Sequence, residues 1–274
     1  MAWVKYFISE SDPDRREIIL AIASQMPFEA FEHLPEGLNA YIRQENDSPT
    51  ELTALLEEFG LDSNYSFELI EEENWNAQWE SNFQPVTIAN TLGIRADFHP
   101  PMKTELEVII TPKMSFGTGH HPTTSLVAEF LLENPPKGEN VLDVGSGTGI
   151  LSILASNLGA SEVIGIDNDP WCDENFRENI ELNSVVNVSS VLGTISDIDS
   201  RQFGTVIANI NRNVLLDIMP QLSKCCSSGA QLFLSGFYER DKDSLVERAN
   251  EFGLNLNSVK ERSGWLSLRF KKEH

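Results

Sequence analysis

Cysteine is scarce in this chain of 274 residues, and its placement excludes two classes of protein. The three cysteines are Cys172, Cys225 and Cys226. They form no C-x-x-C pair, and adjacent cysteines such as the last two rarely bridge to each other. A secreted fold built on disulfides and a zinc site built on cysteines are therefore excluded. We expect reduced thiols in a cytosolic protein.

Long apolar runs are also missing. No stretch approaches the roughly 18 consecutive apolar residues that indicate a membrane-spanning helix. The first residues, Met1 to Lys5, lack the charged-then-apolar layout of a signal peptide. We therefore expect a soluble, cytoplasmic protein that does not bind membranes. The length favours two domains.

Basic residues are few, and the shortage is greatest in the front third of the chain. The whole chain has 20 lysines and arginines against 42 acids, a net charge of −22. Residues 1–80 hold 18 acids and only four bases. Such a region repels phosphate, which argues against direct nucleic-acid binding, and it favours a basic partner. Acidity that only keeps the protein soluble is the alternative.

Glycine, by contrast, is concentrated where it indicates a binding turn. The run 140–144 is short, apolar and β-branched, which predicts a buried strand, and the segment after Gly149 has helical spacing. Gly145, Gly147 and Gly149 therefore lie in a strand-to-helix turn whose backbone can approach a ligand closely. A second predicted strand, 162–166, leads to Asp167, which a doubly wound sheet would present to a ribose.

The spacing of these glycines bears on the choice of cofactor. A dinucleotide fingerprint has the form G-x-G-x-x-G, and Ile150 stands where its third glycine would be. The pattern from Asp143 to Gly149, D-x-G-x-G-x-G, instead resembles the first motif of class I S-adenosylmethionine-dependent methyltransferases. A nicotinamide or flavin cofactor, or a turn that serves only helix-sheet packing, remain the alternatives.

The segment 116–124 precedes a predicted helix and has the glycines and hydroxyls of a loop that covers a cofactor. Thr123 and Thr124 lie in the first helical turn, where their hydroxyls could donate to a carboxylate; for Thr124, a simple helix-start role is the alternative. The histidines at 99, 120 and 121 do not make a metal site, because adjacent histidines point apart and no cysteine or acid joins them at ligand spacing. We expect no metal.

A further candidate residue follows the predicted strand 204–208. Asn209 stands where methyltransferases that act on nitrogen commonly place Asn or Asp. Its carbonyl could accept a proton from an amine and so orient the nitrogen lone pair. The prolines and tyrosine of an Asn-Pro-Pro-Tyr motif are absent, which argues against general amide or base methylation. Capping of the next helix is the other interpretation.

The order of elements predicts an α/β protein with two domains. Residues 1–72 have strand, helix and turn patterns in the order β-α-β-β-α-β, that of a small ferredoxin-like α+β domain. Residues 73–84 indicate a linker helix. Residues 85–274 alternate strands and helices and form the second domain, with a Rossmann-like seven-stranded sheet. Its strands, the last two an antiparallel edge pair, are predicted at 140–144, 162–166, 187–192, 204–208, 230–235, 255–260 and 265–270.

Residues 70–240 resemble the PrmA family of ribosomal-protein methyltransferases. The resemblance rests on the tryptophans at 75 and 79 with Asn82-Phe83, on the loop 116–124, on the glycine turn 143–149, on Gly165 to Pro170, and on Ala208 to Ile210. It implies a ferredoxin-like domain that recognises the substrate, a linker helix and a class I methyltransferase domain. The N-terminal region matches in layout rather than in motif.

The resemblance implies an enzyme that methylates lysine side-chain and N-terminal α-amines of the basic large-subunit ribosomal protein number eleven, with S-adenosyl-L-methionine as cofactor. It places the cofactor-binding positions at Thr124, Gly145, Asp167 and Asn209. The chain departs from the family pattern at His120, where threonine is usual, and at Asn211, where leucine is common. A methyltransferase for another protein, RNA or a small molecule, and a non-catalytic cofactor-binding module, remain the rival functions.

Overall fold

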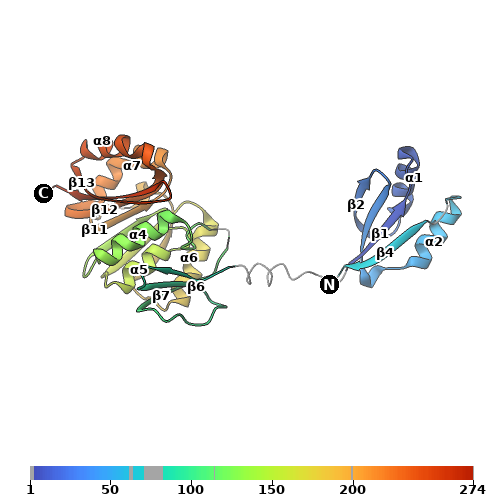
Figure 1. Cartoon of the computed structure of the whole chain (residues 1–274), viewed down its shortest axis with the longest axis horizontal. Coiled ribbons are helices and arrows are strands. Elements are labelled where there is room, and N and C mark those ends of the chain that lie inside the picture. The colour runs from blue at the N-terminus through green and yellow to red at the C-terminus, as the bar shows by residue number, and fades with distance from the viewer. Residues whose placement is uncertain (1–2, 62–63, 71–82, 114, 199, 274) are drawn as a thin grey trace. The chain divides into compact units, whose positions relative to one another are not determined.

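The computed structural model describes residues 3–61, 64–70, 83–113, 115–198 and 200–273. The chain divides into two compact units, Met1–Asn82 and Phe83–His274 (Figure 1). The linker helix predicted over 73–84 falls mainly on positions outside the described residues. No helix in the described ranges is both long and apolar enough to span a membrane. All three cysteines are free.

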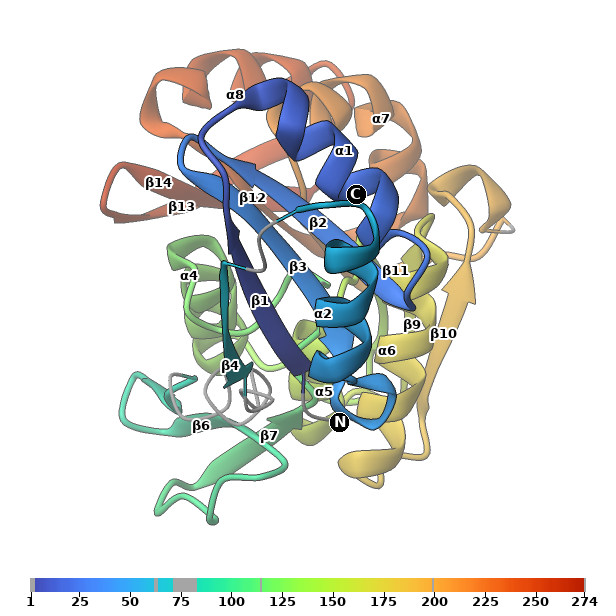
Figure 2. The same ribbon diagram turned by 90° about the vertical axis from the view of Figure 1, so that its right-hand side faces the viewer.

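Unit 1 has the element order expected of a ferredoxin-like domain. Its elements are β1 (Trp3–Ser9), α1 (Pro13–Ala23), β2 (Phe28–Leu34), β3 (Gly37–Arg43), α2 (Pro49–Glu58) and β4 (Tyr65–Ile70). The strands form an antiparallel sheet in the order β2-β3-β1-β4. Both helices lie against one face of this sheet (Figure 2). Alternate residues of β1, namely Val4, Tyr6 and Ile8, are buried beneath them.

Unit 2 is built on the seven-stranded sheet that the sequence predicts. Its order is β10-β9-β8-β11-β12-β14-β13, and β13 and β14 pair antiparallel at one edge. The remaining neighbours β10, β9, β8, β11 and β12 run parallel. The strand bounds are β8 (Asn140–Val144), β9 (Glu162–Asp167), β10 (Val188–Leu192), β11 (Phe203–Asn209), β12 (Cys226–Tyr238), β13 (Leu254–Arg262) and β14 (Trp265–Lys272).

Helices cover both faces of this sheet. Leu215, Met219 and Leu245, from α7 and α8, belong to one core, whereas Phe130 and Ile153, from α4 and α5, belong to the other. Each core is apolar and fully enclosed, which is what stabilises a doubly wound sheet. The bounds are α4 (Pro122–Glu133), α5 (Ile150–Asn157), α6 (Pro170–Leu182), α7 (Arg212–Cys225) and α8 (Lys242–Asn250), with 3-10 turns at Gln44–Asn46, Ile195–Asp197 and Glu239–Asp241.

A second, three-stranded sheet precedes the large one. It consists of β5 (Val86–Ile88), β6 (Leu92–Ala96) and β7 (Leu106–Ile110). The outer two are short apolar runs of the kind that indicate a strand, but β6 is not. All five of its residues are buried, Arg95 among them, so its composition shows neither alternation nor a β-branched run.

Candidate functional site

A cavity of about 580 Å³ opens where the strand order of the large sheet reverses, between β8 and β11. Its lining includes Gly145 after β8, Asp167 at the end of β9, Thr194 after β10 and Asn209 at the end of β11. The carboxyl ends of neighbouring parallel strands meet at this point, which is where such sheets bind ligands. The volume is in the range of sites for small molecules and cofactors.

The glycine turn forms part of the cavity wall, and its shape depends on the absence of side chains. Gly145, Gly147 and Gly149 all have positive φ angles. A Cβ atom on Gly147 would lie 2.2 Å from the carbonyl oxygen of Phe116, and one on Gly149 would lie 1.8 Å from the ring of Phe176. The turn therefore packs against both neighbours only because these positions are glycine.

Asp167 holds this turn and faces the cavity. The N–H of Gly147 donates to Asp167 Oδ2 at 2.9 Å, and the N–H of Asp169 donates to Oδ1 at 3.1 Å. A carboxylate oxygen has two lone pairs, so each of these oxygens can accept a second hydrogen bond. The carboxylate is therefore fixed in position and can still bind a pair of neighbouring hydroxyls.

A second carboxyl group, Asp143, lies beneath the turn, fully buried at the end of β8. The hydroxyl of Ser152 donates to its Oδ2 at 2.7 Å. Burial, together with the negative charge of Asp167, raises the pKa of Asp143 to about 7 despite the hydrogen bond from Ser152. Asp143 is not part of the cavity lining, and its carboxyl group is bonded instead to Ser152 in the first turn of α5.

Asn209 lines the cavity and contacts Thr124, which does not line it. Asn209 Nδ2 donates to Thr124 Oγ1 at 3.4 Å. Asn209 Oδ1 is buried and has no hydrogen-bond partner among the residues that the structure describes. A buried acceptor without a donor is costly, so this oxygen is suited to a donor that a ligand brings. Thr124 is buried behind Asn209, and its neighbour Thr123 lines the cavity instead.

Aromatic side chains from distant parts of the chain form a further wall. The ring of His121 lies edge-on to Phe116 and Trp265, with centroids 5.4 and 4.6 Å away, and all three line the cavity. Tyr238 packs on Trp265 with centroids 4.0 Å apart. Burial lowers the pKa of His121, so its imidazole is neutral at pH 7. The wall is therefore aromatic and uncharged.

The sequence analysis assigned no role to His121, Trp265 or Gly236. Trp265 could not be found, because it belongs to a strand far along the chain that gives no sign of what it faces. Gly236 did carry a signal, since a glycine inside a strand marks a close backbone approach. A Cβ atom there would lie 2.2 Å from the carbonyl oxygen of Ile210, next to Asn209.

The histidines near this site have other partners. His120 Nε2 contacts the carbonyl oxygen of Gln84 at 2.9 Å, whereas His121 Nδ1 contacts Thr123 Oγ1 at 2.7 Å. Within the described ranges, no group of three or more histidine, cysteine or acidic side chains could hold a metal ion.

Comparison with known proteins adds the following. A family model described as "Ribosomal protein L11 methyltransferase (PrmA)" matches residues 14–273. A curated "Ribosomal protein L11 methyltransferase" from Porphyromonas gingivalis is 44% identical over 260 residues, which are 93% of this chain and 90% of that protein. One of the same name from Phocaeicola vulgatus is 40% identical over 260 residues, 93% of this chain and 92% of that protein.

A solved structure is also similar. The crystal structure of a "ribosomal protein L11 methylase" from Lactobacillus delbrueckii subsp. bulgaricus matches with a TM-score of 0.65 and 26% sequence identity. The match covers 70% of this chain and all of that chain. The seven-stranded sheet with helices on both faces is thus an arrangement found in a solved methyltransferase.

Proposed function

Because this chain belongs to the PrmA family of ribosomal protein L11 methyltransferases, we propose that it transfers methyl groups from S-adenosylmethionine to lysine side-chain and N-terminal α-amines of ribosomal protein L11. The observation that carries the proposal is the family match over residues 14–273. That range includes every residue of the cavity described above.

The residues around the cavity fit this cofactor. We assign the ribose hydroxyls to Asp167, whose two oxygens are held in place by backbone N–H groups and can each accept one more bond. The bare backbone at Gly145 and Gly147 permits close approach of the methionine part. When bound, the cofactor supplies a methyl group on a positively charged sulfur. The neutral His121 adds no repulsion to that charge.

Asn209 is assigned to the substrate amine. Its unpaired Oδ1 accepts an N–H of the amine, which directs the nitrogen lone pair into the cavity. The amine must be neutral to react. For a lysine of pKa about 10.4, this costs roughly 4.6 kcal/mol at pH 7, whereas an α-amine of pKa about 7.7 to 8 costs far less.

The proton leaves the amine to water rather than to His121. The lowered pKa of His121 makes it a weak base, and its Nδ1 is already bonded to Thr123. The aromatic wall of Phe116, His121 and Trp265 presents ring surfaces on which the apolar stem of a lysine can pack. The site therefore works by positioning and desolvation rather than by acid-base groups.

Thr124 receives a different assignment from the one that the family resemblance implies. Its hydroxyl accepts from Asn209 Nδ2 and lies behind the cavity wall. We assign it the task of fixing the orientation of the Asn209 amide, so that Oδ1 remains the acceptor. Contact with the methionine end of the cofactor would then fall to Thr123, which lines the cavity.

Unit 1 is proposed to recognise the protein substrate. Residues 1–80 carry 18 acids against four bases, which favours a basic ribosomal protein over nucleic acid. In this assignment, residues 1–72 bind the substrate, residues 73–84 link, and residues 85–274 perform the transfer. A substrate that is a ribosomal protein also implies that the enzyme is located in the cytoplasm.

The proposal is tested by measuring the transfer of labelled methyl groups from S-adenosylmethionine to unmethylated L11. A parallel reaction contains ribosomal RNA in place of L11. Label on the lysine and α-amines of L11 is the expected result. Label on RNA alone would keep the fold and overturn the substrate. Cofactor binding without any transfer would favour a non-catalytic binding module. Asn209→Ala serves as the matched control, because the proposal requires it to bind cofactor and transfer slowly.

A further inference from the structure

The point at which the chain enters unit 2 is held by two histidines. The ring of Phe83 lies edge-on to His120, with centroids 4.9 Å apart, and stacks on His99 with centroids 6.1 Å apart. The carbonyl oxygen of Gln84 lies 2.9 Å from His120 Nε2. We call these four residues, Phe83, Gln84, His99 and His120, the clasp. They fix the first two residues of unit 2.

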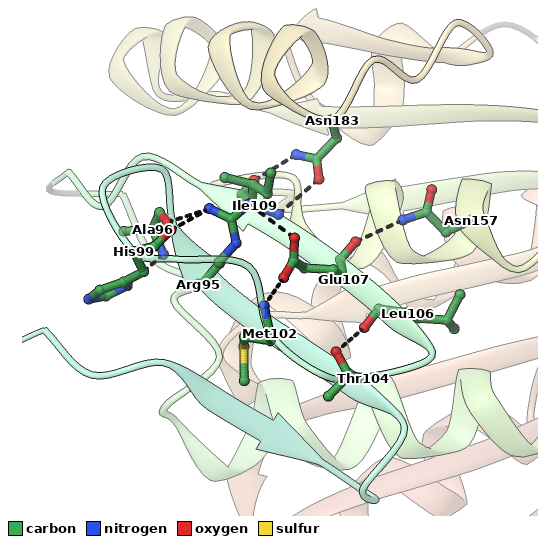
Figure 3. A network of polar contacts seen from close by, with 10 residues as sticks. All are labelled: Arg95, Ala96, His99, Met102, Thr104, Leu106, Glu107, Ile109, Asn157 and Asn183. Carbon is green, nitrogen blue, oxygen red and sulfur yellow. Dashed lines mark hydrogen bonds and ion pairs between the residues drawn. The ribbon is translucent and has the colours of Figure 1, made fainter.

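One side of the clasp is rigid. Arg95, which is buried in β6, donates to the carbonyl oxygens of Ala96 and His99 at 3.1 and 2.9 Å. Its guanidinium also forms an ion pair of 3.0 Å with Glu107 of β7, which in turn accepts from the N–H of Met102 at 2.6 Å. Figure 3 shows how these contacts tie the loop between β6 and β7 to both strands. His99 therefore has a fixed position in unit 2.

The other side of the clasp is continuous with the cavity. His120 Nδ1 bonds to Thr118 Oγ1 at 3.1 Å, within the loop that begins at Phe116. The carbonyl oxygens of Phe116 and Gly117 accept from the N–H and hydroxyl of Thr148, at 2.9 and 2.6 Å, in the glycine turn. The residues at both ends of this loop, Phe116 and His121, line the cavity.

His120 thus connects the cavity with the point at which the chain enters unit 2. A ligand in the cavity bears on Phe116 and His121, and the loop joins both to His120 over very few residues. His120 in turn holds Phe83 and Gln84, through which unit 2 connects to the preceding segment and to unit 1. His120 itself is exposed and is not among the residues that line the cavity.

We propose that His120 is a positioning residue that couples occupancy of the cofactor cavity to the direction in which the chain leaves unit 2 toward unit 1, and hence to presentation of the protein substrate. Only the presentation of the protein substrate rests on the proposed function. Such coupling is reciprocal. Binding of L11 must therefore change the affinity for S-adenosylhomocysteine by the same factor by which S-adenosylhomocysteine changes the affinity for L11.

The first test needs no substrate. Dyes placed through unnatural amino acids at the exposed positions Ser66 in unit 1 and Val186 in unit 2 report the distance between the units by energy transfer. We expect S-adenosylhomocysteine to shift or narrow this distribution in the wild-type chain. The shift is lost in His120→Ala and kept in His120→Gln, whose amide can still donate to Gln84. His33→Ala, an exposed histidine of unit 1, is the matched control and behaves as wild type.

The second test measures coupling by calorimetry of S-adenosylhomocysteine with and without saturating unmethylated L11. We expect a change of about fivefold or more in the wild type and none in His120→Ala. No shift in the wild type, or a shift or coupling that persists in His120→Ala, would overturn the proposal. Failure of the proposed function is separate: wild-type chain would then not methylate L11, whatever the energy transfer shows.

Discussion

Asn209 and Thr124 are 85 residues apart in the chain, yet Nδ2 of the first donates to Oγ1 of the second at 3.4 Å. This contact leaves Asn209 Oδ1 as the buried acceptor at the cavity. Thr124→Val should therefore release the amide and lower kcat by about 2- to 12-fold, the equivalent of one ordinary hydrogen bond. Steady-state kinetics check this, and Thr124→Ser should restore the wild-type rate.

Asn209→Ala should have a larger effect on turnover, since it removes the acceptor itself. We expect kcat to fall about 100-fold, a typical cost of a misplaced reactant, with the affinity for S-adenosylhomocysteine nearly unchanged. Kinetics and calorimetry on the same preparation separate the two quantities. An equal loss of both would make Asn209 a cofactor clamp instead.

Asp167→Ala should weaken cofactor binding sharply. Each hydrogen bond to the carboxylate is worth about 1.5 to 3 kcal/mol, so loss of even one lowers affinity by roughly 10- to 150-fold. Asp167 also accepts from the N–H of Gly147, and Asp167→Asn keeps one acceptor for that contact. Calorimetry with S-adenosylhomocysteine should rank the affinities wild type, Asn, Ala; unchanged affinity in the alanine variant would remove Asp167 from the ribose role.

Gly149→Ala and Gly138→Ala form a matched pair, because both glycines have φ angles above +70°. An added Cβ meets the ring of Phe176 at 1.8 Å in the first case and nothing within 4 Å in the second. Gly138→Ala should cost about 1 to 2 kcal/mol of unfolding free energy from backbone strain alone. Gly149→Ala should cost about 1 to 3 kcal/mol more from overpacking. Urea unfolding measures both, and equal costs would exclude the clash.

Asp143 predicts a pH dependence of stability. Its pKa is raised to about 7 in the folded state, against about 3.9 in an unfolded chain. The stability this contributes is complete below pH 3.9 and is lost as the pH rises through 7. Asparagine cannot ionise, so Asp143→Asn should remove this dependence of the unfolding free energy on pH. The total change that it removes is up to about 4 kcal/mol. Urea unfolding between pH 4 and 8 tests it; parallel profiles for the two proteins would contradict it.

Removal of unit 1 should separate binding from transfer. A chain of residues 83–274 keeps every residue of the cavity and should bind S-adenosylhomocysteine within about twofold of the full chain. It should not methylate intact L11, because the acidic unit is gone. Calorimetry and the labelled-methyl assay give the two readouts. Methylation at the full rate would show that unit 1 is dispensable for recognition.

The elements that local sequence specifies were predicted correctly. The strands β8 and β9 are short apolar runs that end at a glycine turn and at an aspartate, so their positions follow from neighbouring residues alone. Helix α1 also begins as its residues indicate, because Asp12 caps the first turn and Pro13 takes the first helical position. The sequence predicted seven strands with the last two as an antiparallel edge pair, and the structure gives their order in the sheet.

Positions decided by tertiary contacts could not be predicted. Thr123 and Thr124 are neighbours, and only the rotation of α4 on the sheet determines which one faces the cavity. Strand β6 contains Arg95, whose burial depends on its ion pair with Glu107 of the next strand. Neither fact leaves a pattern in the local sequence, because each depends on a partner elsewhere in the chain.

The place of β14 in the sheet determines when the cavity is completed during synthesis of the chain. Although it follows β13 in the chain, β14 lies between β12 and β13, and it carries Trp265 into the cavity wall. A growing chain emerges from the ribosome in sequence order. The cavity therefore stays open on one side until residues 265–272 have been synthesised and inserted. The wall that contains Trp265 is thus the last part of the cavity to form during synthesis.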